Sequence, residues 1–103
     1  MRYLFLLNPT AGKRDCTAEL APAIQAAAGR AGIPPEKLRI AVTRYAGHAR
    51  ELAAEAARTA QADGEPVRIW TAGGDGTFNE ALTGAEGGAL AAVGCLPFGS
   101  GND

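Results

Sequence analysis

The chain has 103 residues, of which 47% are hydrophobic and 20% are charged, and its formal net charge is −1. This length predicts one domain with one hydrophobic core, and the composition is that of a globular protein. A near-neutral charge without a basic stripe disfavours nucleic acid as a partner. The longest apolar run, residues 89–98, is too short for a transmembrane helix, which takes about 20 residues.

The start of the chain does not resemble a signal peptide. Its apolar stretch at residues 4–7 is short and leads directly into Asn8-Pro9. Cys16 and Cys95 fit no metal-ligand spacing, and without a sign of export we expect no disulfide between them. We therefore expect a cytoplasmic protein whose contact with a membrane, if it has one, is peripheral at the surface.

Four short apolar runs have the character of β-strands, at residues 3–7, 38–42, 67–71 and 91–96. Their alternation with helical segments predicts an α/β domain with three layers, Rossmann-like, whose small and mostly parallel sheet has about four strands. The first run is apolar throughout, which favours a central strand buried on both faces. The second and third runs alternate more, which favours positions nearer a sheet edge.

Alanine-rich stretches predict two helices, at residues 17–31 and 48–62, and a third helix follows the third strand. The first helix contains Pro22, so we expect it either to start near Ala21 or to kink there. The second stops at Asp63-Gly64. In the third, Thr77 and Glu80 have the spacing of a capping box, which predicts Thr77 as the N-cap.

Small and polar residues follow every predicted strand. The first strand is followed by NPTAGKRD, the second by TRYAGHA, the third by AGGDGTFNE and the fourth by PFGSGND, and these segments hold seven of the 14 glycines. The carboxyl ends of parallel strands share one edge of a sheet, and ligands of open α/β sheets bind at that edge. The four segments together therefore predict one composite ligand site.

The third of these segments has the features of a phosphate site. Glycines leave the main chain open to a ligand, and the helix that follows offers free N–H groups and a partial positive charge. Asp75 lies where its carboxylate could hold Mg²⁺ beside a phosphate. The alternative is that Asp75-Gly76 is only a tight turn and Thr77 only a cap, and the three companion segments favour the ligand site.

Two common nucleotide-binding motifs are not met. Gly12-Lys13 lacks the earlier glycine and the following Ser or Thr of a P-loop, and GGDGTF does not have the spacing G-x-G-x-x-G. His48, the only histidine, has no Ser or Cys partner implied by spacing, so packing or capping at the helix start is as good an interpretation as ligand contact. Trp70 and Phe78 favour core positions over base stacking.

Four segments resemble, in order and spacing, the diacylglycerol kinase catalytic domain family, which includes bacterial lipid kinases and sphingosine kinases: NPTAG, Thr43 with Gly47-His48-Ala49, GGDGTFNE and PFGSGND. The resemblance covers residues 8–103. It implies transfer of the γ-phosphate of Mg-ATP to a lipid hydroxyl such as that of diacylglycerol. NAD kinases share the glycine-aspartate-glycine core and stay as an alternative, but the extension through Glu80 and the final Gly-Asn-Asp favour the lipid kinases.

The resemblance also implies roles for single residues. Asp75 is the catalytic candidate, and Asp75 and Asp103 are the candidate residues around Mg²⁺. Ser100 stands where threonine is commoner and Ala11 where serine often is, and both keep a small side chain. The implied nucleotide contacts are Asn8, Pro9, Thr10, Ala11, Gly12, Thr43, Gly73, Gly74, Asp75, Gly76, Thr77, Phe78, Asn79, Glu80 and Ser100.

Proteins that this chain resembles continue past Gly-Asn-Asp into a β-rich second domain, which supplies the general base and much of the lipid site. We therefore expect residues 1–103 to be the N-terminal nucleotide-binding half, which holds ATP but does not phosphorylate lipid by itself. A non-catalytic nucleotide-binding or assembly module is an alternative from another class of protein. The face that a second domain would cover could also support a homo-oligomer.

Overall fold

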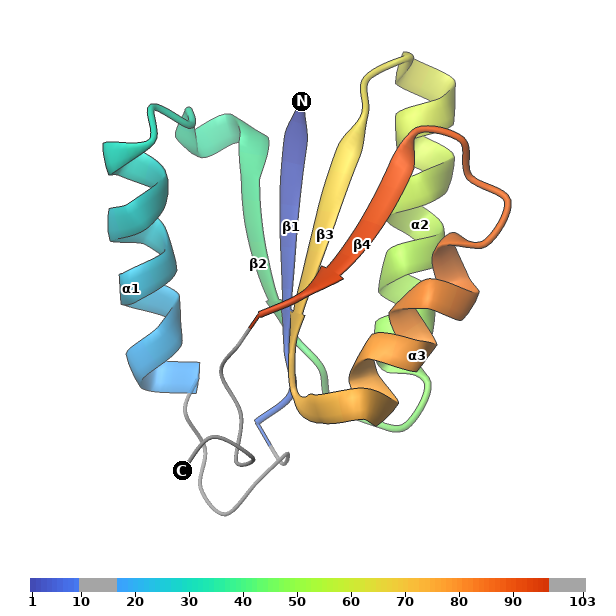
Figure 1. Ribbon diagram of the computed structural model, residues 1–103, viewed down its shortest axis with the longest axis horizontal. Coiled ribbons are helices and arrows are strands. Elements are labelled where there is room, and N and C mark those ends of the chain that lie inside the picture. The colour runs from blue at the N-terminus through green and yellow to red at the C-terminus, as the bar shows by residue number, and fades with distance from the viewer. Residues whose placement is uncertain (10–16, 97–103) are drawn as a thin grey trace.

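Four parallel strands form a single sheet in the computed structural model, which describes residues 1–9 and 17–96 (Figure 1). The strands are β1 (Arg2–Leu7), β2 (Leu38–Val42), β3 (Val67–Ala72) and β4 (Ala91–Cys95). Their order across the sheet is β2-β1-β3-β4, and each of the three pairings is parallel. The predicted α/β architecture with a small parallel sheet is therefore confirmed.

Helices cover both faces of the sheet and complete the three layers. Helix α1 (Thr17–Arg30) lies on one face beside β2, and α2 (His48–Asp63) and α3 (Gly74–Ala85) lie together on the other (Figure 1). A short 3-10 helix, η1 (Pro35–Lys37), precedes β2. In the described part of the chain, no helix has the length and apolar character needed to cross a membrane.

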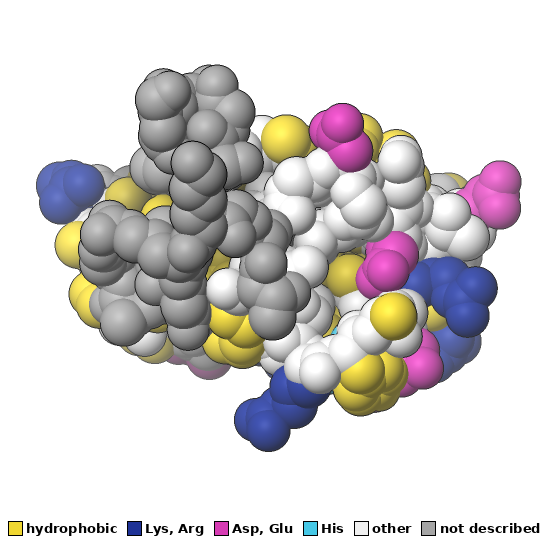
Figure 2. All heavy atoms as spheres, turned by 90° about the horizontal axis from the view of Figure 1, so that it is seen from below, with side chains coloured by type: hydrophobic (Ala, Val, Ile, Leu, Met, Phe, Trp, Pro, Cys, Tyr) yellow, Lys and Arg dark blue, Asp and Glu magenta, His cyan; other side chains and the backbone are white. Residues whose placement is uncertain are grey.

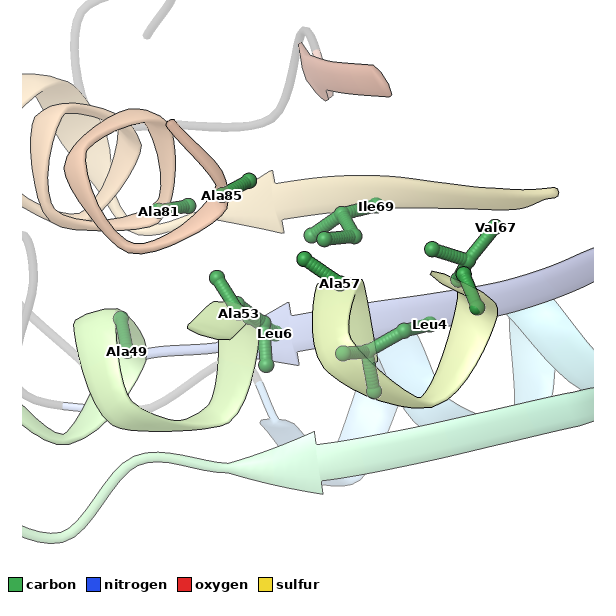
Figure 3. Close-up of a cluster of buried hydrophobic side chains, with 10 residues drawn as sticks. Leu4, Leu6, Ala49, Ala53, Ala57, Val67, Ile69, Ala81 and Ala85 are labelled. Carbon is green, nitrogen blue, oxygen red and sulfur yellow. The ribbon is translucent and has the colours of Figure 1, made fainter. Parts of the chain in front are cut away.

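Strand β1 contributes to the core on both faces of the sheet, because successive side chains of a strand point to opposite sides. Leu4 and Leu6 pack with Val67, Ile69 and the small residues of α2 and α3 (Figure 3). Leu7 packs on the opposite face in a cluster that includes residues of α1. The strand with the most apolar sequence is thus central and covered on both sides, as predicted.

Helices α2 and α3 approach each other closely because small residues line their contact. On α2, Ala49, Ala53 and Ala57 are buried at four-residue spacing, which places them on one helical face. On α3, a Cβ added to Gly84 would overlap the carbonyl oxygen of Arg50. Glycine at this position therefore sets the separation of the two helices.

The first helix begins at Thr17, as its predicted range of residues 17–31 indicated, and runs through Pro22. The alternative of a start near Ala21 is therefore wrong. The missing N–H of proline costs one intrahelical hydrogen bond. Packing of the face that includes Ile24 and Ala28 against the sheet stabilises the helix despite that loss, because most helical stability in proteins comes from burial of an apolar face.

The third helix starts earlier than predicted. It begins at Gly74 with Gly73 as the N-cap, so Thr77 lies inside the first turn and the capping-box assignment is wrong. Gly74 has a φ of +87°, which glycine adopts readily and other residues rarely do. This conformation lets the chain enter the helix three residues before the threonine.

One strand position also differs from the sequence-based expectation. The second strand, β2, lies at an edge as predicted, but β3 lies between β1 and β4. Val67 and Ile69 of β3 are buried against the α2–α3 layer, whereas Arg68 is exposed and Trp70 is partly exposed. The alternation in β3 therefore reflects a face that α1, which lies beside β2, leaves partly open.

Candidate functional site

The carboxyl ends of β1 and β3 lie side by side at the centre of the sheet, and the chain leaves them toward opposite faces. It continues from β1 to α1 on one face and from β3 to α3 on the other (Figure 1). Such a switch point leaves a crevice between the diverging segments, and ligands of open α/β sheets bind there. The candidate site is therefore centred on Asn8, which follows β1, and on the first turn of α3.

Asn8 connects the two segments that diverge at the switch point. Its main-chain N–H donates to the carbonyl oxygen of Ala72 at 2.9 Å, and its Nδ2 donates to Oγ1 of Thr77 at 3.1 Å. Thr77 is only 4% exposed, and its hydroxyl donates to the carbonyl oxygen of Gly73 at 3.3 Å. Thr77 therefore connects the first turn of α3 to Asn8 at the end of β1.

Two glycines of this turn are required by the fold alone. A Cβ on Gly73 would lie 2.6 Å from Cβ of Asn8 and 2.7 Å from Oγ1 of Thr77, which leaves no room for a side chain. Gly74 has the left-handed φ described above, which disfavours every residue with a Cβ. Both positions would need glycine whether or not a ligand binds.

Gly76 has neither of these requirements. An added Cβ would meet no atom within 4 Å, and its φ is not positive. It lies inside α3, where glycine costs about 0.5–1 kcal/mol relative to alanine. The described structure gives no reason for glycine at this position, whereas a ligand that approaches the main chain of the first turn would give one.

The first turn of α3 is suited to an anion. No side-chain hydrogen bond caps the helix, and its N-cap residue is Gly73. The first N–H groups of a helix have no partner within the helix, and this end carries about half a positive charge. Both properties favour a bound phosphate, which would accept hydrogen bonds from these groups.

Asp75 is the one acidic residue of that turn. It is exposed and forms no ion pair with any other described residue. Across residues 1–9 and 17–96, no three His, Cys, Asp or Glu side chains are grouped to hold a metal. One exposed carboxylate beside an open helix start fits Mg²⁺, which takes one or two carboxylates together with substrate phosphates and waters.

Glu80 links α3 to the segment between β2 and α2. Its Oε2 accepts a hydrogen bond from the main-chain N–H of Gly47 at 3.2 Å. Gly47 is the N-cap of α2, and its φ of +89° is a left-handed conformation. The resemblance implied Glu80 as a nucleotide contact, and the structure places its carboxylate on the start of α2.

The segment before α2 is held by a second set of contacts. Nδ1 of His48 accepts the main-chain N–H of Arg44 at 2.9 Å, and the imidazole stacks on Tyr45 with 4.4 Å between ring centroids. The Tyr45 hydroxyl donates to Oε1 of Glu51 at 2.6 Å, which raises the pKa of Tyr45. His48 therefore braces this segment, which agrees with the packing interpretation of its sequence position.

Thr43 lies at the carboxyl end of β2 and is 8% exposed. Its main-chain N–H and its Oγ1 both donate to the carbonyl oxygen of Leu7, at 2.8 and 3.4 Å. The hydroxyl therefore contacts the sheet next to the position where Asn8 follows β1.

The remaining predicted residues fall into two groups. Pro9, Phe78 and Asn79 are described and are at least partly exposed at the same sheet edge. Five others lie outside the described residues: Thr10, Ala11, Gly12, Ser100 and Asp103.

An open hollow that the sequence did not predict lies between α2 and α3. Its volume is about 430 Å³, and it is lined by Ala46, Gly47, Arg50, Asn79, Glu80 and Thr83. Figure 2, which views the carboxyl edge of the sheet, shows acidic and basic side chains close together on the right of the described surface. The spacing of Asn79 and Thr83, four apart on one helix, is the sequence signal that could have indicated a shared face.

The family model described as diacylglycerol kinase catalytic domain matches residues 2–103, which include every strand and helix described above. Among curated proteins, a search found no match to the chain.

Proposed function

Since the chain belongs to the diacylglycerol kinase catalytic domain family, we propose that it is the ATP-binding part of a kinase that transfers the γ-phosphate of ATP to a lipid hydroxyl. The acceptor is a diacylglycerol-like lipid. The observation that carries the proposal is Gly76, a helical glycine that the described structure does not require, at an uncapped helix start beside the switch point of the sheet.

The phosphates of ATP would lie at the first turn of α3. Main-chain N–H groups there can donate to phosphate oxygens, and the absent side chain of Gly76 leaves the approach open. Asn8 and Thr77 hold this turn in place against β1 through the 3.1 Å hydrogen bond between their side chains. A turn fixed in advance loses little entropy when the nucleotide binds.

Asp75 would contribute a carboxylate to the Mg²⁺ that accompanies ATP, and Asp103 would belong to the same metal surroundings. The ion neutralises charge on the phosphate oxygens, and phosphoryl transfer depends chiefly on positioning and on such charge stabilisation. The exposed position of Asp75 leaves it accessible to a metal bound mainly by phosphates and water.

Residues 1–103 by themselves would bind ATP without phosphorylating lipid. Transfer needs a group that accepts the hydroxyl proton and a site that positions the acceptor. In this proposal both belong to a β-rich domain outside these residues, as the resemblance implies. Because the acceptor is a membrane lipid, the complete enzyme would work in the cytoplasm at the membrane surface.

Ligand-induced stabilisation tests the ATP site. At about 100 times its dissociation constant, Mg-ATP should raise the free energy of unfolding by about 2.7 kcal/mol, measured by thermal or denaturant unfolding. Asp75→Asn should unfold at the same temperature as the wild type without ligand and should lose the Mg²⁺-dependent part of the effect. An unfolding transition that is insensitive to millimolar Mg-ATP would contradict the proposal.

A direct assay tests whether residues 1–103 phosphorylate lipid by themselves. Residues 1–103 incubated with Mg-ATP and diacylglycerol vesicles should produce no phosphatidic acid, as followed by transfer of labelled γ-phosphate. Measurable turnover would show that these residues carry a complete active site.

A further inference from the structure

The outer side of β4 has no partner strand among residues 1–9 and 17–96. Strand β4 is the last strand in the order β2-β1-β3-β4, and it pairs only with β3 (Figure 1). An edge strand presents a row of main-chain N–H and C=O groups to which a strand of another chain can bind. Strand β4 therefore offers a surface for pairing with a further strand.

The hydrogen bonds of β4 show which of its main-chain groups face outward. The carbonyl oxygen of Leu90 and the N–H of Leu96 both bond to β3, at 2.8 Å each. Successive residues of a strand direct these groups to alternate sides. The N–H and C=O groups of Val93 and Cys95 therefore point away from β3, toward the open side of the sheet.

Strand β4 lacks the features that protect edge strands from pairing. Its sequence, AAVGC, has no charged residue and no proline. Strand β2 at the opposite edge carries the exposed Arg39, which forms an ion pair with Glu55 of α2 at 3.5 Å. Charged side chains and proline on an edge strand disfavour pairing with another chain. Of the two edges, β4 is therefore the one open to a partner.

Helix α3 has an apolar flank beside this edge. Ala81 is buried in the core, and Thr83 lines the hollow on the side of α2, so Leu82 lies on the flank that faces away from α2. Phe78 precedes Leu82 by four residues and shares its helical face. Because α3 lies over β3 and β4, this flank is on the side of the β4 edge (Figure 1). Leu82 is 43% exposed, one of few large apolar side chains that the described part of the chain leaves in water.

We propose that the outer side of β4, together with Phe78 and Leu82 of α3, binds a second copy of this chain about a two-fold axis. Antiparallel pairing of β4 with its copy aligns the whole strand when Val93 lies on the axis, so that Ala91 of each copy is opposite Cys95 of the other. The outward-facing groups then form the hydrogen-bonded pairs. The two sheets become continuous, and the apolar flanks of the two α3 helices face each other across the axis.

A second copy fits this surface better than an unrelated extended peptide. A two-fold contact uses the same patch on both chains, so the flank of α3 meets an equally apolar flank beside the paired strands. A lone peptide strand would pair with β4 but would leave Leu82 exposed. Neither Val93 nor Leu82 is charged, so these side chains bring no like charges together at the axis. The dimer needs no bound nucleotide and is therefore independent of the proposed function.

Sedimentation equilibrium tests the dimer and its surface. Residues 1–103 should show a concentration-dependent species of twice the 10.5 kDa of one chain. Leu82→Lys places like charges near the axis and should raise the dimer dissociation constant at least about tenfold. Thr83→Lys, at the next and also exposed position but on the side of α2, is the matched control and should leave the constant unchanged. Equal helix content of the two variants by circular dichroism would separate a lost contact from unfolding.

A disulfide tests the register. In a Cys16→Ser background, Ala91→Cys places a thiol opposite Cys95 of the second copy, with about 5.5 Å between Cα atoms, which a disulfide can span. Within one chain these two positions are about 13 Å apart along the strand and cannot be bridged. Oxidation should therefore give a covalent dimer on a non-reducing gel. Ala62→Cys, exposed on α2, is the control in the same background and should give none.

Three results would overturn the proposal. A chain that is monomeric at every concentration would leave the β4 edge to a strand of another origin. A dimer that Leu82→Lys leaves as stable as the wild type would place the contact on another surface. An Ala91→Cys protein that forms no more covalent dimer than the Ala62→Cys control would exclude the antiparallel pairing centred on Val93.

Discussion

The edge of the sheet at the amino ends of the strands and the edge at their carboxyl ends differ in whether their charged groups form ion pairs. At the amino edge, Glu65 accepts Nζ of Lys37 at 2.8 Å, and the α-ammonium group of Met1 and Nε of Arg2 at 3.1 Å each. Arg2 also contacts Asp63 at 2.6 Å. The charges of this edge are therefore neutralised within the chain.

The carboxyl edge shows the opposite arrangement. Asp75 has no ion pair among the described residues, α3 starts without a side-chain cap, and Gly76 leaves open space above the first turn. An open helix start favours a bound anion, and an exposed carboxylate can hold a cation. The amino edge therefore stabilises the fold by itself, whereas a Mg²⁺-bound phosphate would complete the carboxyl edge.

The largest effect is expected at the helix contact that supports both edges. Gly84→Ala places a Cβ against the carbonyl oxygen of Arg50, a main-chain atom that cannot move without shifting α2. Overpacking of this kind should lower the free energy of unfolding by about 3 kcal/mol, as measured by denaturant titration. Gly29→Ala is the matched control, because a Cβ there would meet no atom within 4 Å and its φ is not positive, so it should not destabilise the fold. A Gly84→Ala protein as stable as the control would contradict the described packing of α2 on α3.

A smaller loss of stability, with a loss of binding, is expected at the switch point. Gly73→Ala brings a Cβ against Asn8 and Thr77, whose side chains can adjust more easily than a main chain. We expect the free energy of unfolding to fall by about 2 kcal/mol and the Mg-ATP-induced stabilisation to disappear, because the first turn of α3 must move. Unchanged stability and unchanged nucleotide binding in this variant would mean that Asn8 and Thr77 lie further from Gly73 than described.

The amino edge should affect stability only, and its effect should depend on pH. The ion pairs with Lys37 and the N-terminus lower the pKa of Glu65 from 4.5 to about 2. A lowered pKa in the folded state stabilises the fold above pH 4.5, and this stabilisation is lost as the pH falls from about 4.5 to about 2. Wild type should therefore be more stable than Glu65→Gln at neutral pH, and the difference should vanish near pH 2.

Denaturant titrations of the two proteins between pH 7 and pH 2 would measure this difference. A gap that does not change over this range would show that Glu65 is not the titrating group. Mg-ATP binding at pH 7 should be the same in both proteins, because the amino edge lies at the opposite end of the strands from α3.

Much of the fold could be predicted because buried parallel strands require apolar runs. Each of the four runs became a strand within one residue of its expected bounds. Helix α2 ends at Asp63, and its C-cap Gly64 has a φ of +71°, as Asp63-Gly64 indicated. The start of α3 could not be predicted in the same way. Thr77 has the spacing of a cap, but its hydroxyl is paired with Asn8, 69 residues away in sequence.

The candidate site was predictable in its location and only partly in its contacts. The segments that follow the strands indicated the carboxyl edge, because parallel strands place these segments together. Two of its features depend on the distance between α2 and α3. They are the hydrogen bond between Glu80 and Gly47 and the open hollow between these helices. That distance follows from packing at Gly84, which local sequence patterns do not encode.

The central claim is that Gly76 is kept for a ligand and not for the fold, and Gly76→Ala tests it most directly. Without ligand, the free energy of unfolding of this variant should be about 0.5–1 kcal/mol higher than that of the wild type, because alanine has a higher helix propensity than glycine. In the same titration repeated with saturating Mg-ATP, the added stabilisation seen in the wild type should be largely lost, whereas Gly29→Ala should retain it in full. A Gly76→Ala protein that is stabilised by Mg-ATP as strongly as the wild type would contradict the account.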